Sequence, residues 1–292
     1  MLWGAYVRAT GSGAGCGNHW PLCNGEVVPR SPQSATLIEL AHRLSSGLAL
    51  LAVAALFWWA LRKFPRRHPA RRAAVLSLVF ILSEALIGAG LVLFEQVAHN
   101  ASLTRAFSLS AHLVNTFTLL ATLALTSWWA SGRPPITFKR QGSLAAVLAL
   151  GVFGTMVLGV SGAIAALGDT LFPSASLAEA WRQDFSPAAH LFIRLRVLHP
   201  VLAVAIGAYL VFLATFAALE RPEPLVRKWA WRLAGLVIVQ SAAGALNVLL
   251  QAPNWMQLVH LLLADLVWIA LVLLSAGALS SREVAAETAQ AA

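Results

Sequence analysis

Four histidines lie inside long apolar segments, each near one end of its segment: His42, His112, His199 and His260. At 1.5 Å per helical residue they lie roughly 8–14 Å from that end, in a common layer. An ionisable side chain inside a membrane span is a functional candidate by default. Two neutral imidazoles on facing helices can bind a heme iron axially, and helix bundles commonly hold such sites. The pattern therefore favours heme binding, with helix-to-helix hydrogen bonds, a proton relay or a structural metal site as alternatives.

A carboxylate and several arginines accompany these histidines. Glu39 precedes His42 by three residues, so both side chains project from the same face of one helix. There Glu39 can orient water or accept a proton, and the alternative is a pair with Arg43 one turn further on. Arg196 takes the equivalent place before His199, which predicts different roles for the two halves. Arginines suit anionic heme propionates, with snorkelling to the membrane surface as the alternative; the candidates are Arg43, Arg194 and Arg196.

Both cysteines, Cys16 and Cys23, lie in one short segment rich in glycine. An oxidising compartment permits a disulfide between them, and unpaired thiols are the alternative. Whether such a disulfide is structural or redox-active stays open. A covalently attached c-type heme is excluded, because the sequence has no Cys-x-x-Cys-His. No role is assigned to Glu84, Asp265 or His190.

The elements that position these residues are membrane-spanning helices. The chain is 59% hydrophobic and 11% charged, with a mean hydropathy of +0.72, which is typical of a protein surrounded by lipid. Seven apolar segments are long enough to span a bilayer, at residues 37–61, 71–95, 106–129, 142–167, 190–217, 228–250 and 255–279. Residues 1–7 resemble the last turns of a truncated first span. The expected fold class is an all-α polytopic membrane protein of eight helices, seven of them complete.

The net charge of +9 comes from Lys and Arg between the apolar segments, which is typical of membrane orientation and not of nucleic-acid binding. The cationic connections follow segments 37–61, 106–129 and 190–217, and the positive-inside rule places them in the cytoplasm. We therefore expect a multi-pass protein of the inner (plasma) membrane. Its cysteine-bearing loop is expected to be extracytoplasmic and its C-terminus cytoplasmic.

An internal repeat is indicated by small residues in corresponding segments. Gly88 and Gly244 each lie in the segment before one that carries a histidine near its start, and residues 160–163 echo residues 10–13. Close helix approach alone is the alternative explanation for these glycines. The pattern predicts two pseudo-symmetric four-helix bundles. The expected parts are an N-terminal bundle, a cytoplasmic linker, a C-terminal bundle and a disordered tail, at residues 1–130, 131–141, 142–280 and 281–292.

On these motifs the chain resembles the heme A synthase family from residue 2 to about 275. The motifs are Val7-Arg-Ala-Thr-Gly-Ser-Gly13, Trp20-Pro-Leu-Cys23, Glu39-Leu-Ala-His-Arg43, Ala111-His112, and the stretch from Asn247 through His260 to Asp265. The resemblance implies an oxidoreductase of cytochrome oxidase assembly, which oxidises a porphyrin methyl group of heme O to a formyl group to give heme A. Pro200 departs from the family, in which an arginine commonly follows the first histidine of the second half.

The resemblance also implies roles for single residues. The N-terminal bundle would bind the substrate heme through His42 and His112, with Glu39 as the catalytic carboxylate. The C-terminal bundle would hold the cofactor, heme b, through His199 and His260. The cysteines match the family's extracytoplasmic pair, Cys16 and Cys23. The implied partners are heme O and membrane lipid, with heme O synthase and an electron acceptor as further candidates and no nucleic acid.

Two other functions explain part of the pattern. A non-catalytic diheme electron carrier that exchanges electrons with quinol would also use paired histidines, but it requires neither Glu39 nor the cysteine loop. A transporter with a histidine proton relay explains the repeat, but not the common depth of the four histidines.

Overall fold

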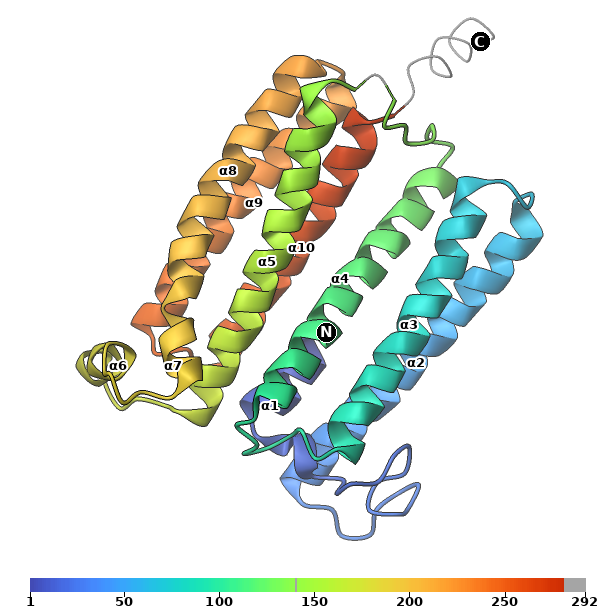
Figure 1. Ribbon diagram of the computed structural model, residues 1–292. Helices are drawn as coiled ribbons and strands as arrows, with labels where there is room; N and C mark the ends of the chain where they lie inside the picture. The colour runs from blue at the N-terminus through green and yellow to red at the C-terminus, as the bar shows by residue number, and fades with distance from the viewer. Residues whose placement is uncertain (140, 281–292) are drawn as a thin grey trace, which may run out of the picture.

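Long helices run side by side through the molecule (Figure 1). The computed structural model describes residues 1–139 and 141–280. The helices are α1 (Leu2–Ala9), a 3-10 turn (Ser12–Ala14), α2 (Ser34–Lys63), α3 (Pro69–Leu93), α4 (Leu103–Ala130), α5 (Ser143–Leu171), α6 (Leu177–Asp184), α7 (Leu191–Arg196), α8 (Leu198–Glu220), α9 (Pro224–Leu249) and α10 (Asn254–Ala278).

Within the described residues, seven stretches are long and apolar enough to cross a membrane, and they coincide with the seven predicted spans. The fold class, an all-α polytopic membrane protein, is therefore confirmed. The short helices α6 and α7 lie in and beside the connection that follows the fourth predicted span. The predicted disordered tail, 281–292, lies outside the described residues, as does residue 140 of the predicted linker.

Local signals explain where several helices begin. Pro69 takes the first position of α3, where its missing N–H costs no hydrogen bond. Ser102 caps α4, because its side chain accepts a hydrogen bond from the amide of Arg105 at 3.2 Å. Pro200 cannot donate to the carbonyl one turn earlier, and α7 ends at Arg196 just before α8 begins. This break places His199 in the first turn of α8.

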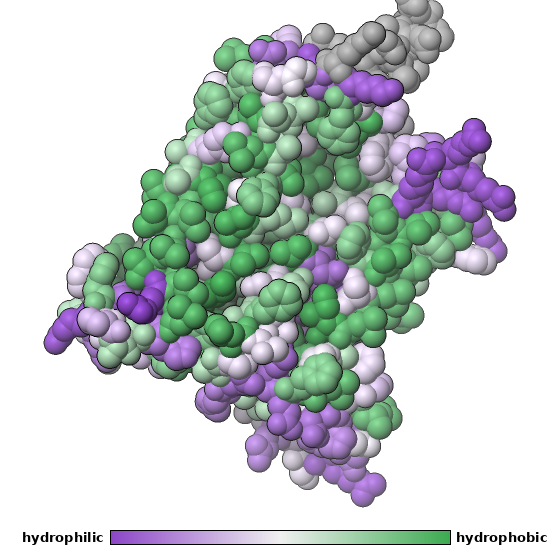
Figure 2. Space-filling view, viewed as in Figure 1, coloured by the Kyte–Doolittle hydropathy of each residue, from purple (hydrophilic) through white to green (hydrophobic). Residues whose placement is uncertain are grey.

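Neighbouring helices contact one another in the same order in the two halves. Helices α1, α2, α3 and α4 pack in sequence, and so do α5, α8, α9 and α10. Contacts of α4 with α5 and α10, and of α1 with α10, join the two sets. The connections after α2, α4 and α8 lie at one end of the molecule, and the other long connections lie at the opposite end (Figure 1). Hydrophilic residues gather at the two ends, with a hydrophobic band between them (Figure 2).

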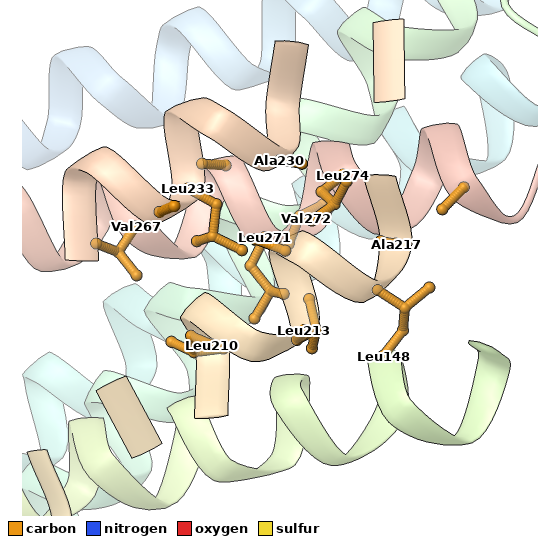
Figure 3. Packing of buried hydrophobic residues seen from close by; sticks show 14 of the residues in the cluster. Leu148, Leu210, Leu213, Ala217, Ala230, Leu233, Val267, Leu271, Val272 and Leu274 are labelled. Carbon is orange, nitrogen blue, oxygen red and sulfur yellow. The ribbon is translucent and has the colours of Figure 1, made fainter. Parts of the chain in front are cut away.

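The largest buried core lies among the later helices. Leu213 of α8 and Leu271 and Leu274 of α10 are completely buried there (Figure 3). The core extends to α4, because Phe117 and Trp268 stack with ring centres 5.1 Å apart. The indole N–H of Trp268 also donates to the backbone oxygen of Phe117 at 2.6 Å. Helix α4 is therefore fixed to the second set of helices as well as to the first.

Candidate functional site

The four histidines come from four helices that all begin at the same end of the molecule, the end that carries the cysteine loop (Figure 1). Each imidazole lies near the start of its helix and is half-buried. The residues and their helices are His42 on α2, His112 on α4, His199 on α8 and His260 on α10.

In the second set of helices, each histidine lies against a glycine of a neighbouring helix. A methyl group added at Gly162 of α5 would lie 3.0 Å from Cε1 of His199. A methyl group at Gly244 of α9 would lie 2.9 Å from Cε1 of His260. These separations are shorter than ordinary carbon contacts of about 3.5–4.0 Å, so the space exists only because both residues are glycine.

The first set repeats the close approach at His42, and at His112 the glycine is in ordinary van der Waals contact. A methyl group at Gly4 of α1 would lie 3.1 Å from Cε1 of His42, and one at Gly88 of α3 would lie 3.9 Å from Nε2 of His112. The pairing of Gly88 with Gly244 agrees with the repeat expected from the sequence. The counterpart of Gly162 is Gly4, however, and not a glycine of residues 10–13, because Gly4 and Gly162 each lie against the first histidine of their half.

The rings of His199 and His260 lie at a separation that suits a metal between them. Their centres are 6.4 Å apart and their planes are nearly perpendicular, at 85°. An iron between two imidazoles needs ring centres about 6 Å apart, since each bond is about 2 Å and each ring centre lies roughly 1 Å beyond its nitrogen. The buried Nδ1 of His260 has no hydrogen-bond partner within the described residues. These two residues could therefore hold a heme iron.

Neutral side chains accompany this second pair. The hydroxyl of Ser161 lies 2.9 Å from Nδ1 of His199. The amide nitrogen of Gln240 lies 3.4 Å from Nε2 of His260. Neither contact was expected from the sequence, because a single serine or glutamine inside an apolar helix has no distinctive spacing.

The first pair has a carboxylate partner. Oε1 of Glu84 lies 3.2 Å from Nδ1 of His112, an ion-pair distance without the linear geometry of a full hydrogen bond. His42 lies within electrostatic reach of both groups. Glu84, which the sequence left without a role, thus belongs to the site. Its position one turn before Gly88 was the signal that could have revealed it.

Glu39 connects α2 to the cysteine loop. Its carboxylate is buried, and Oε2 accepts a hydrogen bond from the amide of Cys16 at 2.8 Å. Oε1 accepts from Nη2 of Arg43 at 2.5 Å, so the alternative expected from the sequence, a pair with Arg43, is present. Arg43 also donates to the backbone oxygens of His19 and Leu22, at 2.7 and 2.6 Å. Both carboxylate oxygens are therefore engaged in holding the loop.

The loop itself is closed by a disulfide between Cys16 and Cys23, whose Cα atoms are 4.4 Å apart. Both cysteines are almost completely buried. Because Glu39 binds the amide of Cys16 directly, the disulfide lies next to the helix that carries His42.

The remaining polar candidates have varied surroundings. Arg196 donates to Asp169 at 3.0 Å and to Asp184 at 2.5 Å, so its guanidinium is occupied by protein carboxylates. Arg194 is exposed. His190 caps α7, where Nδ1 accepts from the amide of Phe192 at 3.3 Å. Asp265 is buried, and its Oδ1 has no hydrogen-bond partner in the described part of the chain.

A conventional metal site is not formed by the described residues. No group of three or more His, Cys, Asp and Glu side chains comes together among them. The arrangement instead offers imidazoles in pairs, which suits the two axial positions of a heme iron and leaves the other ligands to the porphyrin.

The seven spans and the paired histidines define a multi-pass membrane protein with two histidine sites near one end. The family described as cytochrome oxidase assembly protein matches residues 1–272, and the chain belongs to this family. This confirms the resemblance to heme A synthases that the sequence motifs indicated.

Individual relatives carry two different names. A Bacillus cereus protein named heme A synthase is 29% identical over 266 residues, covering 89% of this chain and 82% of the relative. A heme A synthase from Halalkalibacterium halodurans is 39% identical over 150 residues, or 51% of this chain and 49% of the relative. A Thermus thermophilus protein named protoheme IX farnesyltransferase is 55% identical over 278 residues, or 95% of this chain. This chain spans only 46% of that Thermus protein.

Proposed function

We propose that the chain is a heme A synthase, which oxidises a methyl group on the porphyrin of heme O to a formyl group. The observation that carries the proposal is the presence of two histidine pairs, each lying against glycines, at one end of two similar sets of helices. Relatives named heme A synthase support the same reaction. A diheme carrier would need only equivalent pairs, whereas these pairs differ in their polar partners.

The cofactor of this proposal is heme b, held by His199 and His260. When bound, heme b supplies one-electron transfer. Gly162 and Gly244 leave the imidazoles room to lie against their helices, and Ser161 orients the ring of His199. The fit is favoured by the ring separation and by the unpartnered Nδ1 of His260.

The substrate heme is assigned to His42 and His112. Glu39 is the proposed proton acceptor, because it lies on the same helical face as His42. Oε1 accepts both contacts from Arg43, whereas Oε2 accepts one hydrogen bond, from the amide of Cys16, and keeps a lone pair that can take a proton from substrate or water.

Orientation and partners belong to the same proposal. The cysteine loop would be extracytoplasmic and the C-terminus cytoplasmic, in the plasma membrane, because the cationic connections lie at the opposite end from the histidines. The expected partners are heme O synthase and an electron acceptor. The name of the Thermus relative, protoheme IX farnesyltransferase, supports a partner that also modifies heme.

The direct test supplies heme O to the purified chain and separates the extracted pigments by chromatography. We expect heme A from the unmodified chain, and no heme A but retained heme b from Glu39→Ala. Glu220→Ala, an exposed carboxylate at the other end of α8, is the matched control and should convert normally. Full conversion by Glu39→Ala would remove Glu39 from the chemistry. A bis-histidine spectrum without any conversion by the unmodified chain would favour the diheme carrier.

A further inference from the structure

Equivalent positions of the two halves carry a carboxylate in one and an amide in the other. Glu84 lies four residues before Gly88, and Gln240 lies four residues before Gly244. These glycines lie against His112 and His260, and each polar side chain lies near the second histidine of its half, Glu84 at 3.2 Å from Nδ1 of His112 and Gln240 at 3.4 Å from Nε2 of His260. The repeat thus preserves a polar partner for this histidine but changes its charge.

The carboxylate of Glu84 is fixed before any ligand binds. It accepts hydrogen bonds from the hydroxyl of Thr116 and from the side-chain amide of Asn115, the latter at 2.6 Å. The oxygen of that Asn115 amide is held in turn by the hydroxyl of Ser83 at 2.6 Å. Donors on α3 and α4 therefore direct Glu84 toward His112, and the contact does not depend on one flexible side chain.

A carboxylate behind a metal-binding imidazole has two known physical effects. It fixes the tautomer and orientation of the ring, and it increases the basicity of the nitrogen that faces the metal. An amide can orient a ring but adds no negative charge. The two histidines are therefore unequal donors, although they lie on corresponding helices, and their polar partners contact different ring nitrogens.

We propose that Glu84 is a positioning residue that orients His112 and makes it a stronger electron donor than His260. An iron bound by His42 and His112 would then have a lower reduction potential than the heme b bound by His199 and His260. This inference rests on the proposed function, in which the first pair binds the substrate heme. The ferric state of the bound iron would thereby be favoured in the half that carries out the reaction.

The test is a redox titration of the full chain loaded with ferric protoporphyrin IX, followed by its heme absorption. We expect two one-electron steps from the unmodified chain. Glu84→Gln should raise only the step of lower potential, and the reciprocal Gln240→Glu should lower only the step of higher potential. Glu84→Asp keeps the negative charge and should therefore keep the lower reduction potential close to that of the unmodified chain. A merely structural role would not require this.

A second measurement follows protoporphyrin binding by the His260→Ala chain, in which only the first pair is complete. Adding Glu84→Ala should weaken this binding about 10–100-fold, the usual effect of losing such a partner. Unchanged steps in Glu84→Gln, with both hemes bound, would overturn the inference and leave the proposed function standing. The unmodified chain could instead give a single redox step that disappears in His260→Ala and remains in His112→Ala. The first pair would then not bind heme, and both this inference and the proposed function would fail.

Discussion

The charge of Glu39 is neutralised by Arg43 within a buried contact, with side chains 4% and 12% exposed. This ion pair also binds backbone atoms of the cysteine loop, so it joins a loop to a helix where the chemistry is proposed. A residue with both structural and chemical roles cannot be understood from activity alone. Stability measurements are needed to separate the two.

Replacing the cation tests the structural role. Arg43→Met would leave Glu39 charged and buried without its partner, and we expect the free energy of unfolding to fall by about 3–5 kcal/mol. Chemical denaturation in detergent, followed by circular dichroism, measures this change. The matched control is Arg30→Met, which removes a pair with Glu26 whose side chains are 93% and 43% exposed. An exposed pair contributes only about 0–1 kcal/mol, so equal losses in the two variants would contradict this account.

At the scale of helices, glycines allow His42, His199 and His260 to lie close to their neighbouring helices. Gly244 and Gly235 both lie on α9, but an added methyl group meets His260 at the first and nothing within 4 Å at the second. The same chemical change should therefore have opposite consequences at two places on one helix.

Gly244→Ala should displace His260 and remove heme b, whereas Gly235→Ala should retain the pigment. The second variant should also be slightly more stable, by about 0.5–1 kcal/mol, because alanine restricts the unfolded chain and favours the helix. The heme-to-protein ratio of the purified variants gives the answer. Normal heme content in Gly244→Ala would show that the close contact does not control the ring.

Much of the helical frame could be predicted from the sequence. A run of about 20 apolar residues in a membrane has few alternatives to a spanning helix, because its backbone must form all its hydrogen bonds internally. The structure confirms the prediction of seven spans. The break before His199 could not be placed, because a proline can either kink a continuous helix or lie in the first turn of a new one. Helix α6 was not predicted, although Ser176 and Glu179 have the spacing of a helix-capping pair at its start.

The site was only partly predictable. Histidines stand out in an apolar sequence, but the partners Ser161 and Gln240 do not. The comparison of residues 160–163 with residues 10–13 is wrong for Gly162, because its true counterpart, Gly4, is recognised by the histidine that each contacts. Such correspondences depend on which helices pack together, and sequence spacing alone does not give that information.

Over the whole molecule, one arginine ties the first helix to the other half. Nη1 of Arg8 donates to the backbone oxygen of Ala166 at 2.5 Å and to Thr170 at 2.6 Å, both on α5. Nη2 donates to the side chain of Gln257 on α10 at 2.8 Å. Together with the stacked Phe117 and Trp268, this contact keeps the two sets of helices in a fixed relation.

Arg8→Met should therefore weaken the association of α1 with α5 and α10. Hydrogen bonds to charged groups contribute about 1.5–3 kcal/mol each, so the unfolding temperature should fall by several degrees. Thermal unfolding in detergent measures the effect. Arg66→Met, in the exposed connection between α2 and α3, should leave the temperature unchanged.

The central claim is a division of labour between the two histidine pairs, and it is tested most directly by extracting the pigments of two matched variants expressed in cells that supply heme O. We predict that His112→Ala retains heme b but contains no heme A. His260→Ala should contain less heme b than His112→Ala, because its second pair, which holds the resident heme b, is incomplete. The account would be contradicted if His112→Ala contained heme A. It would also be contradicted if His112→Ala lost heme b while His260→Ala kept it.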